Sequence, residues 1–245
     1  MKICVAQMKP AKCDIATNLE RHCQFAEVAS SMGADLVVFP ELSLTGYEPQ
    51  AARQLAMTVN DARLDGLEEL SRDKKLALGV GLPTSTPVGT CISMVIFQPD
   101  GPRLLYSKRY IHADERPFFV CGSNLGPIEM QGNRIAMAIC FELSVARHAS
   151  KAASDRATIY LVSAAKSTTG VAAAHARLAE IATSHSMLVL MSNAVGPCDN
   201  FVAGGRSAAW NRDGELLGQL DEAGEGLLLL DSASAEVSTS PSPAQ

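Results

Sequence analysis

Short apolar runs alternate with longer amphipathic runs along most of the chain, and this alternation restricts the folds that the chain can adopt. The apolar runs are rich in β-branched residues, which is typical of buried strands, and the amphipathic runs have the period of helices. Predicted strands lie at 2–7, 35–39, 76–82, 92–98, 103–107, 134–139, 158–163 and 188–192. Predicted helices lie at 14–32, 61–75, about 142–154 and 171–186. Strands that alternate with helices in this way predict an α/β fold.

Two segments, 76–107 and 206–230, have the pattern of meanders, so we expect mixed sheets rather than a purely parallel one. Neither a linker nor a short-period repeat interrupts residues 1–231, which we therefore interpret as one domain. Residues 232–245 are rich in Ser, Pro and Ala. Such a segment is expected to be a tail without packing of its own, or else an arm that docks on a partner subunit.

Charge and cysteine usage narrow the classes of partner. The chain has 21 Lys and Arg against 26 Asp and Glu, a net charge of −5, and its basic residues are scattered. This pattern does not support a nucleic-acid groove or binding to an anionic membrane surface. No stretch reaches the roughly 20 apolar residues that span a bilayer.

The cysteines indicate a reducing compartment. The chain has seven cysteines without a CxxC pair, which indicates reduced thiols in the cytoplasm. Because the chain also lacks an HExxH motif, we expect no metal site.

Three reactive side chains follow predicted strands directly. Glu41 comes after the strand at 35–39, Lys108 after the strand at 103–107, and Cys140 after the strand at 134–139. In open α/β sheets, ligands bind beyond the carboxyl ends of the strands. A carboxylate, an amine and a thiol at three such ends are therefore candidates for one site.

These residue types suit acyl transfer through a thioester. A thiol needs a base or a lowered pKa to become a nucleophile, and a buried Glu41 is a suitable base. Lys108 supplies a fixed positive charge for the thiolate and for an oxyanion. A helix starting after Cys140 would add its dipole and the Phe141 N–H as a second oxyanion donor. Taken singly, each residue has a structural explanation, and spacing alone does not bring Glu41 to Cys140.

The motifs around these residues, taken together, resemble those of the nitrilase (carbon–nitrogen hydrolase) superfamily. In this chain Lys108 comes 67 residues after Glu41, and Cys140 comes 32 residues after Lys108, as in that superfamily. The motifs are Pro40-Glu41 with Thr45-Gly46-Tyr47, Tyr106-Ser107-Lys108, Ile139-Cys140-Phe141-Glu142, Asn193-Ala194-Val195-Gly196 and Gly204-Gly205-Arg206-Ser207. The resemblance covers nearly the whole chain.

The resemblance implies a four-layer α-β-β-α sandwich and a Glu–Lys–Cys triad that needs no metal or organic cofactor. It implies Glu41 as general base, Lys108 as stabiliser of the tetrahedral intermediate, and Cys140 as nucleophile. It also implies a second glutamate after the lysine, for which Glu115 is the candidate, and a homodimer or higher homo-oligomer. Tyr47, Phe118 and Glu142 flank these motifs and are expected to line the substrate pocket.

The function expected first is hydrolysis of a small-molecule amide, at a carbon–nitrogen bond other than a peptide bond. Nitrile hydrolysis by the same triad is an alternative, which Glu142 after an aromatic residue favours. A non-catalytic interaction protein with this scaffold is a third possibility, although all three triad positions are filled.

Overall fold

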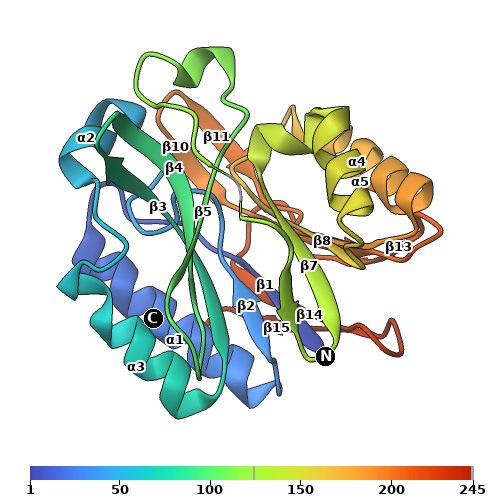
Figure 1. The fold of residues 1–245 in the computed structure, drawn as a ribbon. Coiled ribbons are helices and arrows are strands. Elements are labelled where there is room, and N and C mark those ends of the chain that lie inside the picture. The colour runs from blue at the N-terminus through green and yellow to red at the C-terminus, as the bar shows by residue number, and fades with distance from the viewer. Residues whose placement is uncertain (124, 244–245) are drawn as a thin grey trace.

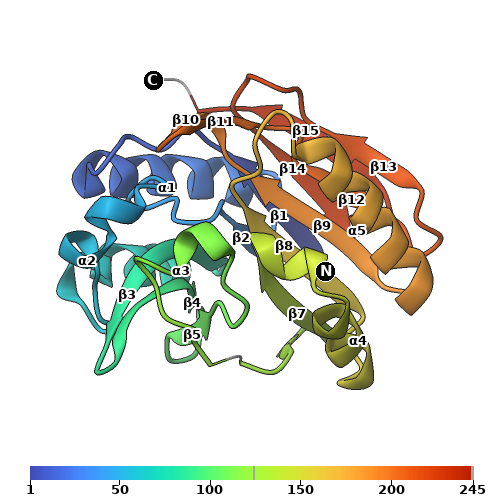
Figure 2. The same ribbon diagram turned by 90° about the horizontal axis from the view of Figure 1, so that it is seen from above.

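Two β-sheets lie face to face, and helices cover the outer face of each (Figure 1, Figure 2). We analysed a computed structural model, which describes residues 1–123 and 125–243. The layers follow the order α-β-β-α, so the predicted four-layer sandwich with mixed sheets is confirmed.

The first sheet has seven strands in the order β15-β14-β1-β2-β3-β4-β5. Strand β1 is parallel to β2, and β2 is parallel to β3, whereas the other neighbours are antiparallel. The strands are β1 (Lys2–Gln7), β2 (Leu36–Val38), β3 (Ala77–Thr86), β4 (Gly89–Phe97), β5 (Leu104–Ser107), β14 (Gly226–Asp231) and β15 (Val237–Pro241).

The second sheet has six strands in the order β13-β12-β9-β8-β7-β6. Its three central strands, β7 to β9, are parallel, so their carboxyl ends meet at one edge. The strands are β6 (Ile128–Met130), β7 (Asn133–Ile139), β8 (Ile159–Ala164), β9 (Leu188–Asn193), β12 (Ala208–Trp210) and β13 (Leu216–Gln219). A separate hairpin joins β10 (Val195–Cys198) to β11 (Phe201–Gly204), and the sequence pattern did not predict it.

Helices α1 (Ile15–Ser31) and α3 (Asp65–Lys74) cover the first sheet, and α4 (Ala146–Ser154) and α5 (Val171–His185) cover the second. A short helix, α2 (Ala52–Leu55), lies between α1 and α3 in the chain. Asp14 caps α1, as the sequence suggests, because its carboxylate accepts a hydrogen bond from the Thr17 N–H. No helix in the described part of the chain is long and apolar enough to cross a membrane.

The core follows the two-residue period of the strands. Ile3 and Val5 of β1 pack between the two sheets, whereas Cys4 and Ala6 point the other way, toward α1 and α3. A third cluster fills the space between the second sheet and α4 and α5. Burial on both faces explains why these strands are nearly continuous apolar runs.

Two expectations about local structure are wrong. The helix expected at 142–154 is divided: a five-residue 3-10 helix, Cys140–Ser144, ends at Val145, where the backbone is extended, before α4 begins. The tail expected at 232–245 is not without packing, because Val237–Pro241 form β15 along β14; residues 244–245 of that segment lie outside the described residues. Antiparallel pairing with β14 places β15 in the sheet despite its low hydrophobicity.

Candidate active site

Lys108 forms an ion cluster with two glutamates inside the protein. Its Nζ lies 2.7 Å from Oε1 of Glu41 and 2.6 Å from Oε1 of Glu115. The side chains of Lys108 and Glu41 are 0% exposed, and that of Glu115 is 3% exposed. Glu41 comes from the segment after β2 and Lys108 from the end of β5, so two of the three predicted strand ends do meet.

Two glycines allow this close approach of the backbone. A Cβ on Gly81 of β3 would lie 2.4 Å from the carbonyl oxygen of Pro40, which precedes Glu41. A Cβ on Gly122 would lie 2.2 Å from Cβ of Ser107, which precedes Lys108. A larger side chain at Gly81 would displace the segment that carries Glu41, and one at Gly122 would displace the end of β5 next to Lys108. These glycines therefore help to keep the two side chains in place.

Cys140 follows β7 directly and lines a pocket beside this cluster. Its φ of +44° is in the left-handed region, which is uncommon for a residue other than glycine. Strained backbone of this kind clusters at functional sites, where the surrounding structure maintains it. The turn carries the thiol from the end of the strand into the pocket.

The charges of the cluster set the resting protonation states. Burial raises the pKa of Cys140 to about 11, with a further contribution from Glu41, although Lys166 and Lys108 act in the opposite direction. Burial also raises the pKa of Glu41, and Lys108 and the nearby Cys140 thiol partly oppose this. Burial lowers the pKa of Lys108, but Glu41 and Glu115 outweigh burial and raise it. The thiol is therefore neutral at rest, and Lys108 is an ammonium.

The local structure at Cys140 does not support the expected contribution of a helix dipole. The helix that starts there is a single 3-10 segment of five residues, too short for a substantial dipole, and it ends at Val145. If the thiol is to act as a nucleophile, it therefore needs a neighbouring base. Oε2 of Glu41 is buried without a donor at hydrogen-bonding distance and angle among the described residues, so it has a free lone pair.

Glu115 links the cluster to the pocket. Its Oε1 accepts hydrogen bonds from Lys108 Nζ and from the Tyr47 hydroxyl, at 2.6 and 3.0 Å. Its Oε2 accepts one from the His112 N–H at 2.8 Å, which fixes the 3-10 helix that carries it. Burial raises the pKa of Tyr47, so this hydroxyl stays a donor.

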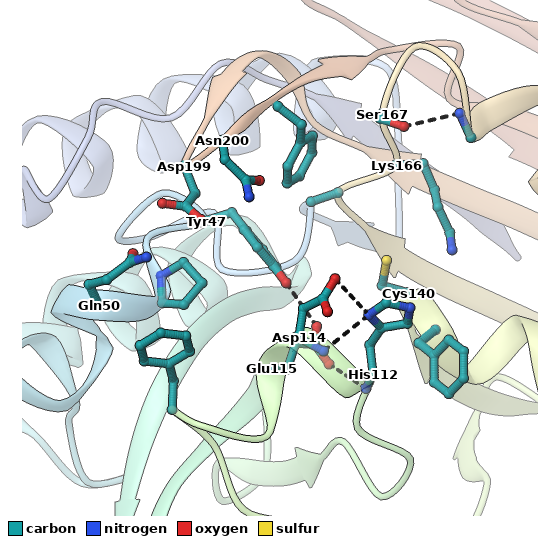
Figure 3. Close-up of a pocket in the computed structure, with 16 residues that line it drawn as sticks. Tyr47, Gln50, His112, Asp114, Glu115, Cys140, Lys166, Ser167, Asp199 and Asn200 are labelled. Carbon is teal, nitrogen blue, oxygen red and sulfur yellow. Dashed lines mark hydrogen bonds and ion pairs between the residues drawn. The ribbon is translucent and has the colours of Figure 1, made fainter.

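The pocket has a volume of about 480 Å³, and its lining comes from segments that follow strands of both sheets and from the β10–β11 hairpin (Figure 3). Five of the predicted residues line it: Tyr47, Glu115, Phe118, Cys140 and Phe141. The remaining lining residues are Pro49, Gln50, His112, Asp114, Ala165, Lys166, Ser167, Gly170, Asp199, Asn200 and Phe201. Within the described residues, no group of three His, Cys, Asp or Glu side chains has the arrangement of a metal site.

The sequence predicts that Glu142 contacts the substrate, but Glu142 does not line this pocket. It is fully buried behind Cys140 and accepts four hydrogen bonds. Oε1 accepts from the N–H groups of Arg109 and Tyr110, at 2.8 and 3.3 Å. Oε2 accepts from the Ile139 N–H at 2.8 Å and from the Tyr106 hydroxyl at 2.6 Å. Glu142 thereby ties the residue before Cys140 to the residue after Lys108.

Replacing Glu142 by glutamine should weaken this tie. A glutamine has one carbonyl oxygen, so two of the four donors lose their acceptor and face an NH₂ group. We expect Glu142→Gln to reduce the free energy of unfolding by about 1–3 kcal/mol, the cost of unsatisfied buried polar groups. Urea unfolding measures this, and Glu180→Gln on the exposed face of α5 is the matched control. Equal stability of Glu142→Gln and the wild type would contradict the structural role.

Sequence reasoning missed several lining residues, including His112, Lys166, Asp199 and Phe201. Lys166 follows β8 by two residues, so the rule that identified Glu41, Lys108 and Cys140 also applies to it. Asp199 and Phe201 belong to the β10–β11 hairpin, which the sequence pattern did not predict. Phe201 packs edge-on against Tyr47, with ring centroids 5.5 Å apart.

Comparison with known structures identifies similar proteins. An amidase from Nesterenkonia sp. AN1 superimposes with a TM-score of 0.87 at 26% identity, over 96% of this chain and 94% of that chain. Two further structures of that amidase superimpose with TM-scores of 0.86 and 0.85. One is a mutant in complex with butyramide, and the other shows the result of Michael addition of acrylamide at the active-site cysteine.

Comparison of sequences gives two informative relatives. A glutamine-dependent NAD(+) synthetase from Acinetobacter baylyi is 26% identical over 88% of this chain and 41% of its own length. An omega-amidase from Yersinia enterocolitica is 28% identical over 58% of this chain and 55% of its own length. The chain thus spans about half the length of these curated relatives. The sequence profile of the carbon-nitrogen hydrolases matches residues 2–240, and the chain therefore belongs to the carbon–nitrogen hydrolase family.

Proposed function

We propose that this protein hydrolyses small-molecule amides through a thioester on Cys140. The observation that carries the proposal is the buried cluster of Lys108 with Glu41 and Glu115, next to a pocket that Cys140 lines. A buried ion cluster has a large desolvation cost, so its presence beside a cysteine that lines a pocket favours a catalytic explanation.

The relatives support the same reaction. The Nesterenkonia structures are of an amidase with an active-site cysteine, and one of them is in complex with butyramide. The Yersinia relative is an omega-amidase. The similarity to the Nesterenkonia amidase extends over 96% of this chain.

The proposed acylation starts with proton transfer. Because the pKa of Cys140 is about 11, little thiolate exists at neutral pH, and Glu41 takes the thiol proton as Sγ attacks the amide carbon. The carbonyl oxygen becomes an oxyanion. Lys108 has three donor hydrogens, of which Glu41 and Glu115 take two, so the third is available to this oxyanion, with the Phe141 N–H as second donor.

Collapse of the tetrahedral intermediate breaks the carbon–nitrogen bond. Glu41 gives its proton to the leaving nitrogen, ammonia or an amine departs, and the acyl group stays on Sγ as a thioester. Glu41 then removes a proton from water, which attacks the thioester carbon. The second intermediate releases the carboxylic acid, and the proton returns to Sγ, so the enzyme is restored without an oxidant or reductant.

A matched panel of amides and nitriles tests the proposal. We expect aliphatic amides such as butyramide to give carboxylic acid and ammonia in equal amounts. Detection of ammonia by a coupled assay and of acid by chromatography measures both products. Conversion of the nitriles alone would overturn the amide assignment, and no conversion of either class would overturn the function. The expected homo-oligomer stays a prediction, which light scattering of the native protein tests.

A further inference from the structure

Lys108 and Cys140 come from different sheets, so their relative position depends on the contacts that join the sheets beside them. Lys108 follows β5 of the first sheet, and Cys140 follows β7 of the second. Apolar packing between the sheets is non-directional, whereas a hydrogen bond fixes both a distance and an angle. A set of hydrogen-bonded side chains crosses from one sheet to the other next to these two residues.

This buried network starts at Tyr160 of β8 and ends at Glu142, two residues after Cys140. Nδ1 of His148, on α4, lies 2.7 Å from the Tyr160 hydroxyl. Nε2 of His148 lies 2.9 Å from the hydroxyl of Tyr106 on β5, and this hydroxyl donates to Oε2 of Glu142 at 2.6 Å. All four side chains are buried. Because each polar group has a partner, the network holds its members in one arrangement.

The direction of these bonds follows from the acceptor at the end. Three backbone N–H groups also donate to the Glu142 carboxylate, which therefore only accepts, as an ionised carboxylate does. Since Tyr106 gives its proton to Glu142, the Tyr106 oxygen accepts from Nε2 of His148. Burial lowers the pKa of His148, so the ring is neutral and Nδ1 accepts from Tyr160. Every bond of the network thus points toward Glu142.

Glu142 passes this constraint to both catalytic segments. Its Oε2 also accepts from the N–H of Ile139, directly before Cys140. Its Oε1 accepts from the N–H of Arg109, directly after Lys108. A rotation of the Glu142 carboxylate would therefore move the nucleophile relative to the ammonium. The tyrosine and histidine behind it limit this rotation.

We propose that His148 is a positioning residue for the reaction. Through Tyr106 it fixes the orientation of Glu142, and Glu142 sets the nucleophile against the ammonium. This proposal rests on the amidase function proposed above. His148 lies outside the lining of the pocket, so its loss should leave substrate binding unchanged and slow the chemical step. A misplacement of reacting groups by about 1 Å costs on the order of 100-fold in rate.

Two amide variants of His148 test this role with butyramide as substrate. Asparagine is too short to reach Tyr106, so kcat of His148→Asn should fall by about 10- to 100-fold, while KM stays within about two-fold. Glutamine is longer and carries an NH₂ donor near the position of Nε2, so His148→Gln should recover most of the wild-type kcat. Both variants are assayed below their unfolding transitions. His185→Asn, at the end of α5 opposite the pocket, is the matched control and should leave kcat unchanged.

The proton on the imidazole gives a readout that does not depend on activity. In ¹⁵N–¹H spectra of the wild type, Nε2 of His148 should carry the proton and Nδ1 should not, with the signals identified by their loss in His148→Gln. Tyr160→Phe removes the donor to Nδ1 and should lower kcat. Because Tyr160 acts through His148, adding Tyr160→Phe to His148→Asn should lower kcat no further.

The outcomes distinguish a positioning role from a structural one. A His148→Asn variant that is less stable, but whose folded form keeps the wild-type kcat, would overturn the proposal, as would a proton on Nδ1. If His148→Asn does not fold, Tyr160→Phe decides, and a wild-type kcat in that variant would count against the proposal. A wild type that hydrolyses no amide would instead overturn the amidase function, while the proton on Nε2 would still support the network.

Discussion

Replacing Cys140 by alanine will abolish amide hydrolysis. Without Sγ no thioester forms, and the ion cluster alone has no nucleophile to activate. Because removal of a catalytic nucleophile acts on the whole catalytic unit, we expect kcat to fall by at least about 10,000-fold. Ammonia release from butyramide, measured at saturating substrate, checks this expectation.

The fold should survive this substitution. Cys140 is half-buried, and alanine removes only one sulfur atom at the pocket wall, so the free energy of unfolding should change by less than about 1 kcal/mol. Cys121→Ala is the matched control, because Cys121 is an exposed thiol outside the pocket and should leave kcat unchanged. A well-folded Cys140→Ala variant that retains wild-type turnover would contradict the assignment of the nucleophile.

Replacing Lys108 by methionine will damage both stability and activity. Methionine fills much of the same volume but leaves Glu41 and Glu115 as two buried carboxylates without their common cation. Removing one partner of a buried ion pair costs about 3–5 kcal/mol, so the midpoint of urea unfolding should fall markedly. The oxyanion also loses its ammonium donor, and we expect kcat to fall by about 1,000-fold or more.

A triple variant distinguishes the charge effect from a packing effect. Adding Glu41→Gln and Glu115→Gln to Lys108→Met removes the two uncompensated charges, so most of the lost stability should return. Activity should stay absent, because the base is missing as well. Lys151→Met on the exposed side of α4 serves as the surface control. A Lys108→Met variant as stable as the wild type would contradict the role of the cluster.

Part of this site could be predicted from the sequence, because the strand-end rule depends only on local pattern. Glu41, Lys108 and Cys140 each follow a recognisable apolar run, and the resemblance to the family added Glu115. The distance between Glu41 and Lys108 could not be predicted in this way, since it depends on tertiary packing. Gly81 lets β3 approach the backbone around Glu41, and Gly122 lets its own segment approach Ser107, next to Lys108.

The incorrect predictions have physical causes as well. Glu142 is a charged residue next to the proposed nucleophile, yet four donors from the backbone and Tyr106 explain its burial without a substrate. The segment Val237–Pro241 has little apolar character, and its strand forms because β14 presents an edge to pair with. Lys166 also follows a strand, but it was not predicted because the residues around it do not form a recognisable motif.

The central claim is that Cys140 carries the acyl group of an amide as a thioester. Rapid mixing of the wild type with butyramide, acid quenching and intact-mass analysis test this most directly. We predict a mass increase equal to one butyryl group, located on the peptide that contains Cys140 and absent from Cys140→Ala. Steady turnover of the amide with no such adduct at any quench time, or an adduct on another residue, would contradict the claim.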